Sequence, residues 1–376
     1  MTVAGGGEEG SKLVVLEYAD LQAGKDLTAE VARAFGPSGL GICAVRGIPN
    51  LQEIRQKLLP QARELALLSP EKLARYELPE AQYCTGWSRG REKFKGKPDL
   101  AKGSFYANPL FEDPADGDEA IRAKYPWGTC RNVWPEELPE LAQAFKDMAR
   151  LMYEAAKPLV RQCDLLVEAQ HPGHGQKLFE ATFTNSRMCS GRLLHYYSPS
   201  SVPNAGKSDA WCGWHNDNSV ITALAPAIWM LEETGEQLPV ACSTGGLYVR
   251  SRDRKVTRVS LPADCIGFQI GEASQIMSGG LLVATPHQVR VHEHREGDKP
   301  ISRETFALFM EPQWDASIGP PEQVGFLEAL KDEETELIPP LSKRLRPAEG
   351  ERVVCFGKYL ADSFAEYYKH NNDDEA

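Results

Sequence analysis

The segment Trp211-Cys-Gly-Trp-His215-Asn-Asp217-Asn-Ser-Val-Ile-Thr222 carries an imidazole and a carboxylate two residues apart, directly before a β-type run. In an extended strand, residues i and i+2 point to the same face of the sheet. If this segment is extended, His215 and Asp217 converge on one point, as two ligands of a single metal ion must. Chance alone often produces a His-x-Asp pair, so the prediction of a metal site depends on a third ligand elsewhere.

The best candidate for this third ligand is His287, in Ala284-Thr-Pro-His287-Gln-Val-Arg290. It follows the apolar run 280–284, where a strand would deliver it. Two histidines and one carboxylate on one side of an ion leave the other side open, which is the facial triad of non-haem Fe(II) oxygenases. His292 and His294 are rival ligands, but their charged, turn-like surroundings favour solvent exposure.

A zinc site is the alternative metal assignment, because Cys212 lies three residues before His215. No second C-x-x-C or H-x-x-x-H pair accompanies it. A neutral imidazole and a carboxylate suit Fe(II), whereas thiolates favour zinc or an iron–sulfur cluster. The sequence therefore favours iron.

A candidate anion site follows the triad in the chain. Arg303 and Thr305 are two residues apart in a β-like run that ends at Met310, so both side chains can point into the same interior. A guanidinium and a hydroxyl together fit a carboxylate. Tyr197 could add a phenolic donor. A surface arginine in an ion pair is the alternative for Arg303 taken alone.

Composition and charge limit the class of protein. The 376 residues carry a net charge of -11, with 42% hydrophobic and 25% charged residues, as in an ordinary globular protein with a sizeable core. The acidic charge argues against a nucleic-acid backbone or an anionic membrane as default partner. Nine scattered cysteines without C-x-x-C indicate thiols in a reducing compartment. Without a signal-peptide pattern or a long apolar run, we expect a cytoplasmic monomer.

The order of patterns along the chain predicts an α+β protein with a mainly β core. Helical spacing dominates the front, above all from Leu141 to Leu159, and short strands with turn signals follow residue 186. Such strands suggest a sandwich or a double-sheet jelly roll, and helices return after Pro312. We expect four parts: a flexible tail 1–11, a helical and mixed region 12–185, a β core 186–312 and a C-terminal helical extension 313–376.

The segment from Ala81 to Trp134 has no clear period and is rich in Gly, Pro and aromatic residues. We expect a long irregular lid over the site, since such segments are often functional. Its aromatic and basic character suits a small organic molecule, including one with an acid group. The candidate substrate contacts in it are Tyr83, Trp87, Phe105 and Tyr106.

The order of these motifs resembles the isopenicillin N synthase-like 2-oxoglutarate/Fe(II) dioxygenases. The matching elements are His215-x-Asp217, Gly271-Glu-Ala-Ser-Gln-Ile-Met-Ser-Gly-Gly280, Thr285-Pro-His287-x-Val289 and Arg303-x-Thr305. The glycine-bounded run 39–48 and Asn132-Val-Trp-Pro-Glu136 before the long helix are similar to this family as well. The likeness runs from about residue 12 to residue 312.

The resemblance implies a double-stranded β-helix core with a helical N-terminal region. His215, Asp217 and His287 would hold Fe(II), and Arg303 and Thr305 would bind the distal carboxylate of 2-oxoglutarate. Tyr197 would match the tyrosine of the family's Asn-x-Tyr element. The chain departs from the family pattern at His195, which replaces the usual Asn, at Thr305, which replaces the commoner Ser, and in a longer loop 288–302.

The activity implied by the resemblance is oxidation of a small organic molecule, by hydroxylation, desaturation or ring closure, with release of succinate and CO2. O2 would be the oxidant and ascorbate a candidate reductant. Trp211 and Trp214 would keep water from the site, whereas plain core packing is the better interpretation of Phe309. Two alternatives stay open: an Fe(II) oxidase of the same fold that does not use 2-oxoglutarate, and a non-catalytic jelly-roll binding protein.

Overall fold

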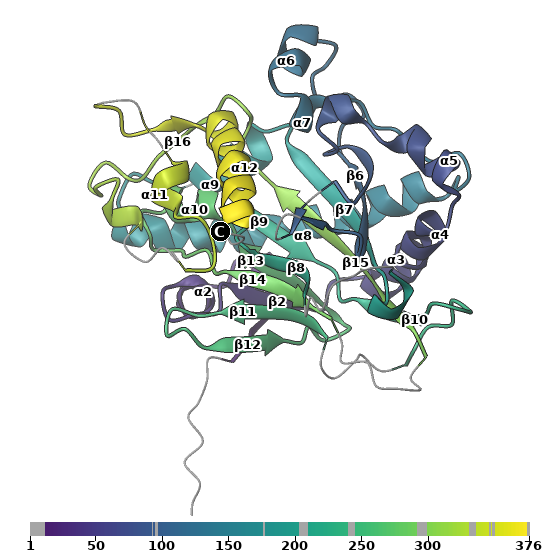
Figure 1. The fold of residues 1–376 in the computed structure, drawn as a ribbon. Helices are drawn as coiled ribbons and strands as arrows, with labels where there is room; N and C mark the ends of the chain where they lie inside the picture. Colours follow the sequence, from purple (N-terminus) through teal and green to yellow (C-terminus); the bar gives the residue numbers. More distant parts are fainter. Residues whose placement is uncertain are drawn as a thin grey trace, which may run out of the picture.

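Two β-sheets that enclose a common interior form the centre of the molecule (Figure 1). The computed structural model describes residues 12–373 except 92, 95–96, 176, 203–209, 240–244, 292–298, 331–335, 346 and 348–349. The predicted tail 1–11 and the rival ligands His292 and His294 lie outside the described residues. Within the described chain, no helix is long and apolar enough to cross a membrane.

The larger sheet has nine strands. Its order is β1 (Val14–Glu17), β2 (Ile42–Arg46), β13 (Cys265–Ile270), β9 (Ile221–Leu224), β15 (Ile301–Met310), β7 (Cys189–Tyr196), β6 (Lys102–Ala107) and β3 (Gly86–Arg89), with β10 (Ile228–Leu231) also paired to β15. The smaller sheet has the order β12 (Val256–Val259), β11 (Gly246–Arg250), β14 (His287–Arg290) and β8 (Ala210–His215). Two facing sheets of this kind are the double-stranded β-helix that the sequence predicted.

Helices cover the outer face of the larger sheet. These are α2 (Thr28–Phe35), α3 (Leu51–Leu58), α4 (Pro60–Ala66) and the long α8 (Leu141–Gln170), with α1 (Tyr18–Gln22), α5 (Pro70–Leu73) and α9 (Lys177–Phe179) nearby. The methionines Met148 and Met152 on α8 are fully buried and belong to the core. The rings of Phe145 on α8 and Phe306 on β15 meet edge to face at 4.8 Å, a favourable aromatic geometry. This packing holds β15 in place from outside.

The prediction of an irregular lid over 81–134 is partly wrong, because this segment contributes β3 and β6 to the larger sheet. In these strands Gly103 pairs with His195, and the Trp87 ring lies over Gly103. A Cβ atom at position 103 would lie 2.3 Å from that ring. The glycine weakens the strand pattern in the sequence, yet the packing of the tryptophan requires it.

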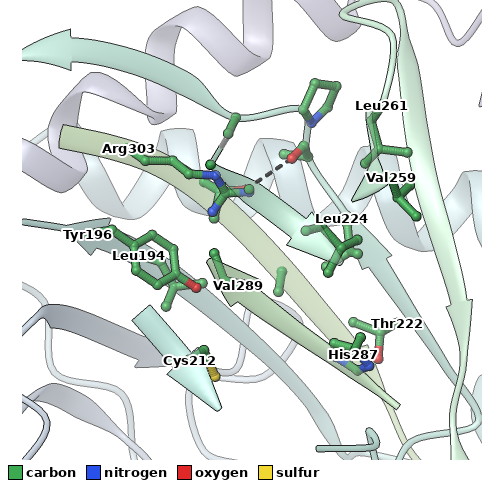
Figure 2. Close-up of a pocket in the computed structure, with 18 of the residues that line it drawn as sticks. Leu194, Tyr196, Cys212, Thr222, Leu224, Val259, Leu261, His287, Val289 and Arg303 are labelled. Carbon is green, nitrogen blue, oxygen red and sulfur yellow. Dashed lines mark hydrogen bonds between the residues drawn. The ribbon is translucent and has the colours of Figure 1, made fainter. Parts of the chain in front are cut away.

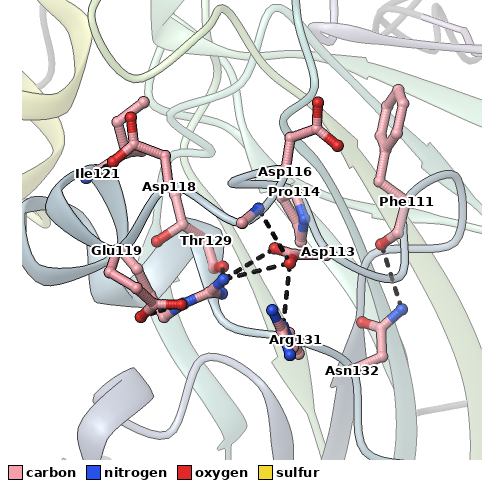
Figure 3. A network of polar contacts seen from close by, with 12 residues as sticks. Phe111, Asp113, Pro114, Asp116, Asp118, Glu119, Ile121, Thr129, Arg131 and Asn132 are labelled. Carbon is pink, nitrogen blue, oxygen red and sulfur yellow. Dashed lines mark hydrogen bonds and ion pairs between the residues drawn. The ribbon is translucent and has the colours of Figure 1, made fainter.

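The rest of this segment is a loop that an ionic network stabilises (Figure 3). The Asp113 carboxylate accepts from Arg122 Nη2 and from Arg131 Nε, at 3.0 Å in each case. Asp118 caps α6 (Glu119–Lys124) by accepting from two backbone N–H groups of its first turn, at 2.9 and 3.0 Å, which is the usual role of an aspartate at this position. The loop continues through α7 (Pro126–Thr129), whose residues line a large cavity described below.

The C-terminal part of the chain forms α11 (Leu341–Arg344), a short pair of strands β16 (Ser317–Ile318) and β17 (Val354–Cys355), and the long α12 (Phe356–Asp373). In Figure 1 helix α12 lies across the open end of the two sheets, near β8 and β9. The predicted C-terminal helices are therefore present, and α12 contributes to the wall of the larger cavity described below.

Candidate active site

The three predicted metal ligands meet at one edge of the smaller sheet. Strands β8 and β14 are neighbours, and His287 pairs directly with His215 across them. His215 is the last residue of β8, and Asp217 follows two positions later. The Asp217 Oδ1 atom lies 3.9 Å from His215 Nε2 and 3.7 Å from His287 Nε2. Among the described residues, these three form the group whose donor atoms could hold a metal ion, all within 4.8 Å of one another.

The outer nitrogens of both imidazoles are oriented by other groups. His215 Nδ1 lies 2.8 Å from the carbonyl oxygen of Gly213. His287 Nδ1 lies 3.2 Å from the Thr285 carbonyl oxygen and 2.6 Å from Gln269 Nε2. In His215 a proton on Nδ1, donated to the Gly213 oxygen, leaves a lone pair on Nε2, and in both rings Nε2 is the atom that faces Asp217. This arrangement is usual for metal-binding histidines, so the residues fit an ion.

The local electrostatics differ between the two histidines. Burial lowers the pKa of His287 to about 4, so its ring is neutral and ready to act as a ligand. Burial also lowers the pKa of His215, but the neighbouring Cys212 and Asp217 outweigh this effect and raise the pKa to about 9. The Cys212 thiol lies 3.7 Å from His215 Nδ1, the nitrogen that faces away from Asp217. The geometry therefore does not favour the zinc alternative with Cys212 as a ligand.

A small cavity of about 130 Å³ extends from the triad between the two sheets (Figure 2). Arg303 and Thr305 both line it, as their spacing on one strand predicted. Arg303 Nη1 is buried without a hydrogen-bond partner among the described residues. The Thr305 hydroxyl donates to the Ala225 carbonyl oxygen at 3.0 Å and can still accept. A buried guanidinium with an unsatisfied N–H is suited to an anion that enters this cavity.

The expectation that Tyr197 contributes to this cavity does not agree with its position. Its hydroxyl donates to the Ala66 carbonyl oxygen at 3.3 Å, behind the larger sheet. Tyr196 lines the cavity instead, and the Arg303 guanidinium lies 5.2 Å from the centre of its ring. Side chains alternate along a strand, so neighbouring tyrosines must face opposite sides. His195 also faces outward, where its Nδ1 lies 2.8 Å from Glu304 Oε2.

The two tyrosines give a first prediction. We expect Tyr196→Phe to weaken binding of a dicarboxylate such as 2-oxoglutarate about 3- to 10-fold, because the phenol next to Arg303 loses its hydroxyl. Tyr197→Phe, the matched control, should leave that affinity unchanged. Calorimetric titration of the metal-loaded protein measures both. A loss confined to Tyr197→Phe would contradict this assignment.

A second, larger cavity of about 420 Å³ opens on the other side of the triad. The two cavities share His215, Asp217, Arg192, Cys212 and Phe309. The interpretation of Phe309 as plain core is therefore wrong, because it lines both cavities. Trp214 lines the larger one as expected, whereas Trp211 is fully buried in a cluster between the sheets.

Of the four substrate contacts predicted in the lid segment, two line a cavity and two do not. Tyr83 and Tyr106 line the larger cavity, whereas Trp87 and Phe105 are buried in the main core. Several lining residues were not found from the sequence. They are Glu311 directly after β15, the two asparagines that flank Asp217, and Leu360, Phe364 and Tyr367 of α12. The alternation that identified Arg303 and Thr305 also points to Phe309 and Glu311 on the same face.

A buried network of hydrogen bonds connects α12 and α11 to the loop between His215 and Asp217. The Glu272 carboxylate, at the start of α10 (Glu272–Met277), accepts from both terminal nitrogens of Arg344 at 2.6 Å. It also accepts from Asn216 Nδ2 at 2.9 Å and from the Tyr359 hydroxyl. The Glu272 N–H donates to the Asp217 carbonyl oxygen at 2.8 Å. One carboxylate therefore fixes the loop between His215 and Asp217 against the C-terminal helices.

Known proteins resemble this chain in sequence and in fold. No profile of a known protein family matches the sequence. The homoarginine-6-hydroxylase 2-ODD-233 of Oryza sativa subsp. japonica is 24% identical over 280 residues, which are 72% of this chain and 74% of the hydroxylase.

Two solved structures share the fold. A Caulobacter crescentus protein described as a 2OG-Fe(II) oxygenase superposes with a TM-score of 0.66 at 18% identity, covering 95% of this chain and 99% of that one. A Neurospora crassa protein in complex with alpha-KG and thymine gives a TM-score of 0.62 at 21% identity, covering 96% of this chain and 98% of that one. The chain has the fold of the 2-oxoglutarate/Fe(II) oxygenases.

Proposed function

We propose that this protein is an Fe(II)- and 2-oxoglutarate-dependent dioxygenase that hydroxylates or desaturates a small organic molecule and releases succinate and CO2. The observation that carries the proposal is the pair of cavities that meet at the triad. The smaller cavity ends at Arg303 and the larger one opens beside Trp214 and Tyr106. This arrangement provides separate places for a cosubstrate and a substrate next to one ion.

The residues of the chain have distinct tasks in this proposal. His215, Asp217 and His287 would hold Fe(II), which when bound supplies the redox chemistry that couples substrate oxidation to decarboxylation of 2-oxoglutarate. Arg303 binds and orients the distal carboxylate of 2-oxoglutarate, with help from Thr305 and Tyr196. Phe309 and Trp214 exclude water from the space between the two cavities.

The relatives support a small-molecule substrate. A hydroxylase named for homoarginine and a Neurospora crassa protein whose structure contains thymine both align with most of this chain. We propose in addition that this chain acts as a cytoplasmic monomer, that its functional parts divide at residues 185 and 312, and that ascorbate is its reductant. Size-exclusion chromatography with light scattering tests the monomer.

The role of Arg303 gives a second prediction. Arg303→Ala should raise the concentration of 2-oxoglutarate needed for half-maximal succinate release by roughly 30-fold or more, because a bidentate charged contact is lost in a buried site. At saturating 2-oxoglutarate the rate should recover in large part. An unchanged requirement would show that the arginine does not bind the cosubstrate.

The other two candidate functions separate in the same assay. An iron oxidase that does not use 2-oxoglutarate would consume O2 with its substrate and release no succinate. A binding protein would do neither. The Nη1 atom of Arg303, unpartnered among the described residues, favours binding of a cosubstrate, since a buried donor without a partner is costly unless a ligand accepts from it.

A further inference from the structure

Glu311 lines the larger cavity and directly follows β15, the strand that carries Arg303 and Thr305. Positions 303, 305, 307 and 309 of β15 all line the smaller cavity, and positions 309 and 311 line the larger one. Alternate residues of one strand share a face. The face of β15 that presents Arg303 to the cosubstrate therefore presents Glu311 to the substrate.

Two asparagine side chains that flank Asp217 line the same cavity as Glu311. The Val220 N–H donates to the Met310 carbonyl oxygen at 3.0 Å, which brings the segment after Asp217 next to the end of β15. The two asparagines are Asn216 and Asn218. Asn216 is 9% exposed, and its Oδ1 is buried without a hydrogen-bond partner among the described residues. The unpartnered Asn216 amide oxygen and the Glu311 carboxyl group favour a ligand that donates hydrogen bonds, and the Asn218 Nδ2 atom, also buried without a partner among the described residues, favours an acceptor on the same ligand.

The cations that line this cavity already have partners. Lys102 Nζ lies 3.0 Å from Asp99 Oδ2. Arg192 donates to the Ser104 hydroxyl through Nε at 3.1 Å and through Nη2 at 2.9 Å. Arg91 has an ion-pair partner of its own. We therefore expect none of these three side chains to pair with a second carboxylate.

The surroundings of Glu311 disfavour its charged form. Burial, with a smaller contribution from the charge of Asp217, raises the pKa of Glu311 to about 8. A cation beside a carboxyl group favours its charged form and lowers its pKa. No cation among the described residues pairs with Glu311, so a ligand that brings a positive charge would favour the ionised form of this carboxyl group.

We propose that the substrate carries a cationic nitrogen, as a protonated amine, amidine or guanidinium group, and that Glu311 binds it with the Asn216 amide oxygen as a second acceptor. This inference rests on the proposed function, because it assigns the larger cavity to the substrate. Glu311 is then the specificity-determining residue of the enzyme. It anchors the charged end of the molecule and leaves the adjoining C–H bonds beside the triad.

The experiment compares matched probes of equal length: alkylamines and alkylguanidines of four to eight carbons, the corresponding alcohols, and the corresponding carboxylic acids. Binding is measured by calorimetry with Mn(II) and 2-oxoglutarate under anaerobic conditions. Stimulated succinate release is measured with Fe(II) and O2. We expect the amines or guanidines to bind at least about 30-fold more tightly than the alcohols, as a buried charge pair would provide, and the acids to bind least.

Three variants assign this preference to Glu311. Glu311→Gln keeps a hydrogen-bonding group but removes the charge, and it should lose at least about 30-fold for the cationic probes while changing little for the alcohols. Glu311→Lys should reverse the preference toward the acids. Glu322→Gln, an exposed glutamate outside the cavity, is the matched control and should behave as the unmodified protein.

The results that overturn the inference are distinct from failure of the proposed function. Equal binding of amines and alcohols, a preference for acids, or an unchanged preference in Glu311→Gln would each overturn the cationic substrate. Absence of 2-oxoglutarate binding and of succinate release in the unmodified protein would contradict the dioxygenase assignment, and the calorimetric comparison of probes would still decide the role of Glu311.

Discussion

Asp217→Ala is expected to abolish iron retention and reduce substrate oxidation below detection. The triad has one carboxylate among its three ligands, and two imidazoles without that charge hold a divalent ion poorly. The variant should remain folded, because the hydrogen bond from Glu272 N–H to residue 217 uses the backbone oxygen. Iron content after gel filtration and succinate release measure the effect. His215→Ala should behave in the same way.

A suitable control for this prediction is His174→Ala. The His174 Nε2 atom lies 3.0 Å from the Met277 carbonyl oxygen, away from the triad. This variant removes an imidazole of the same chemistry and should keep its iron. Gln269→Leu should give an intermediate result, because the amide orients His287 without binding the ion, and we expect its metal affinity to fall about 10- to 100-fold. Full iron content in Asp217→Ala would refute the metal centre.

Arg344→Met is expected to cause the largest loss of stability, about 3 to 5 kcal/mol, because it leaves the Glu272 carboxylate buried without its cation. Glu272 is 1% exposed and Arg344 is fully buried, so water cannot replace the lost contacts. The shift of the urea unfolding midpoint measures this loss. Because Asn216 is bound to the same carboxylate, we also expect the folded variant to lose iron more readily.

Two further variants distinguish the loss of the buried Glu272–Arg344 ion pair from a general weakening of α12. In Glu272→Met/Arg344→Met both charges are absent, and most of the lost stability should return. Lys358→Met removes an exposed ion pair with Asp362 on α12, 2.6 Å in length, and should change stability by no more than about 1 kcal/mol. Equal losses in Arg344→Met and Lys358→Met would mean that burial of the pair has no special weight.

Much of the site could be predicted because its signals are local. The pair His215 and Asp217, and the pair Arg303 and Thr305, lie two residues apart, and the structure brings each pair to one interior. The long helix was found from its apolar spacing, since burial on one face leaves a mark every three or four residues. The sequence did not give the bounds of β8 and β14. We expected His287 to follow a strand, whereas it is the first residue of β14.

The sequence by itself determined the residue types that could form a metal centre and an anion site, because ligand chemistry belongs to the side chains. It did not determine which of the alternating side chains of β7 face the cavity. That choice follows from pairing: Arg303 lies opposite Tyr196, and residues directly opposite across antiparallel strands share a face, so Tyr196 lines the cavity and Tyr197 does not. Tertiary structure likewise decided that α12 and Glu311 line the larger cavity, because both depend on contacts between segments far apart in the chain.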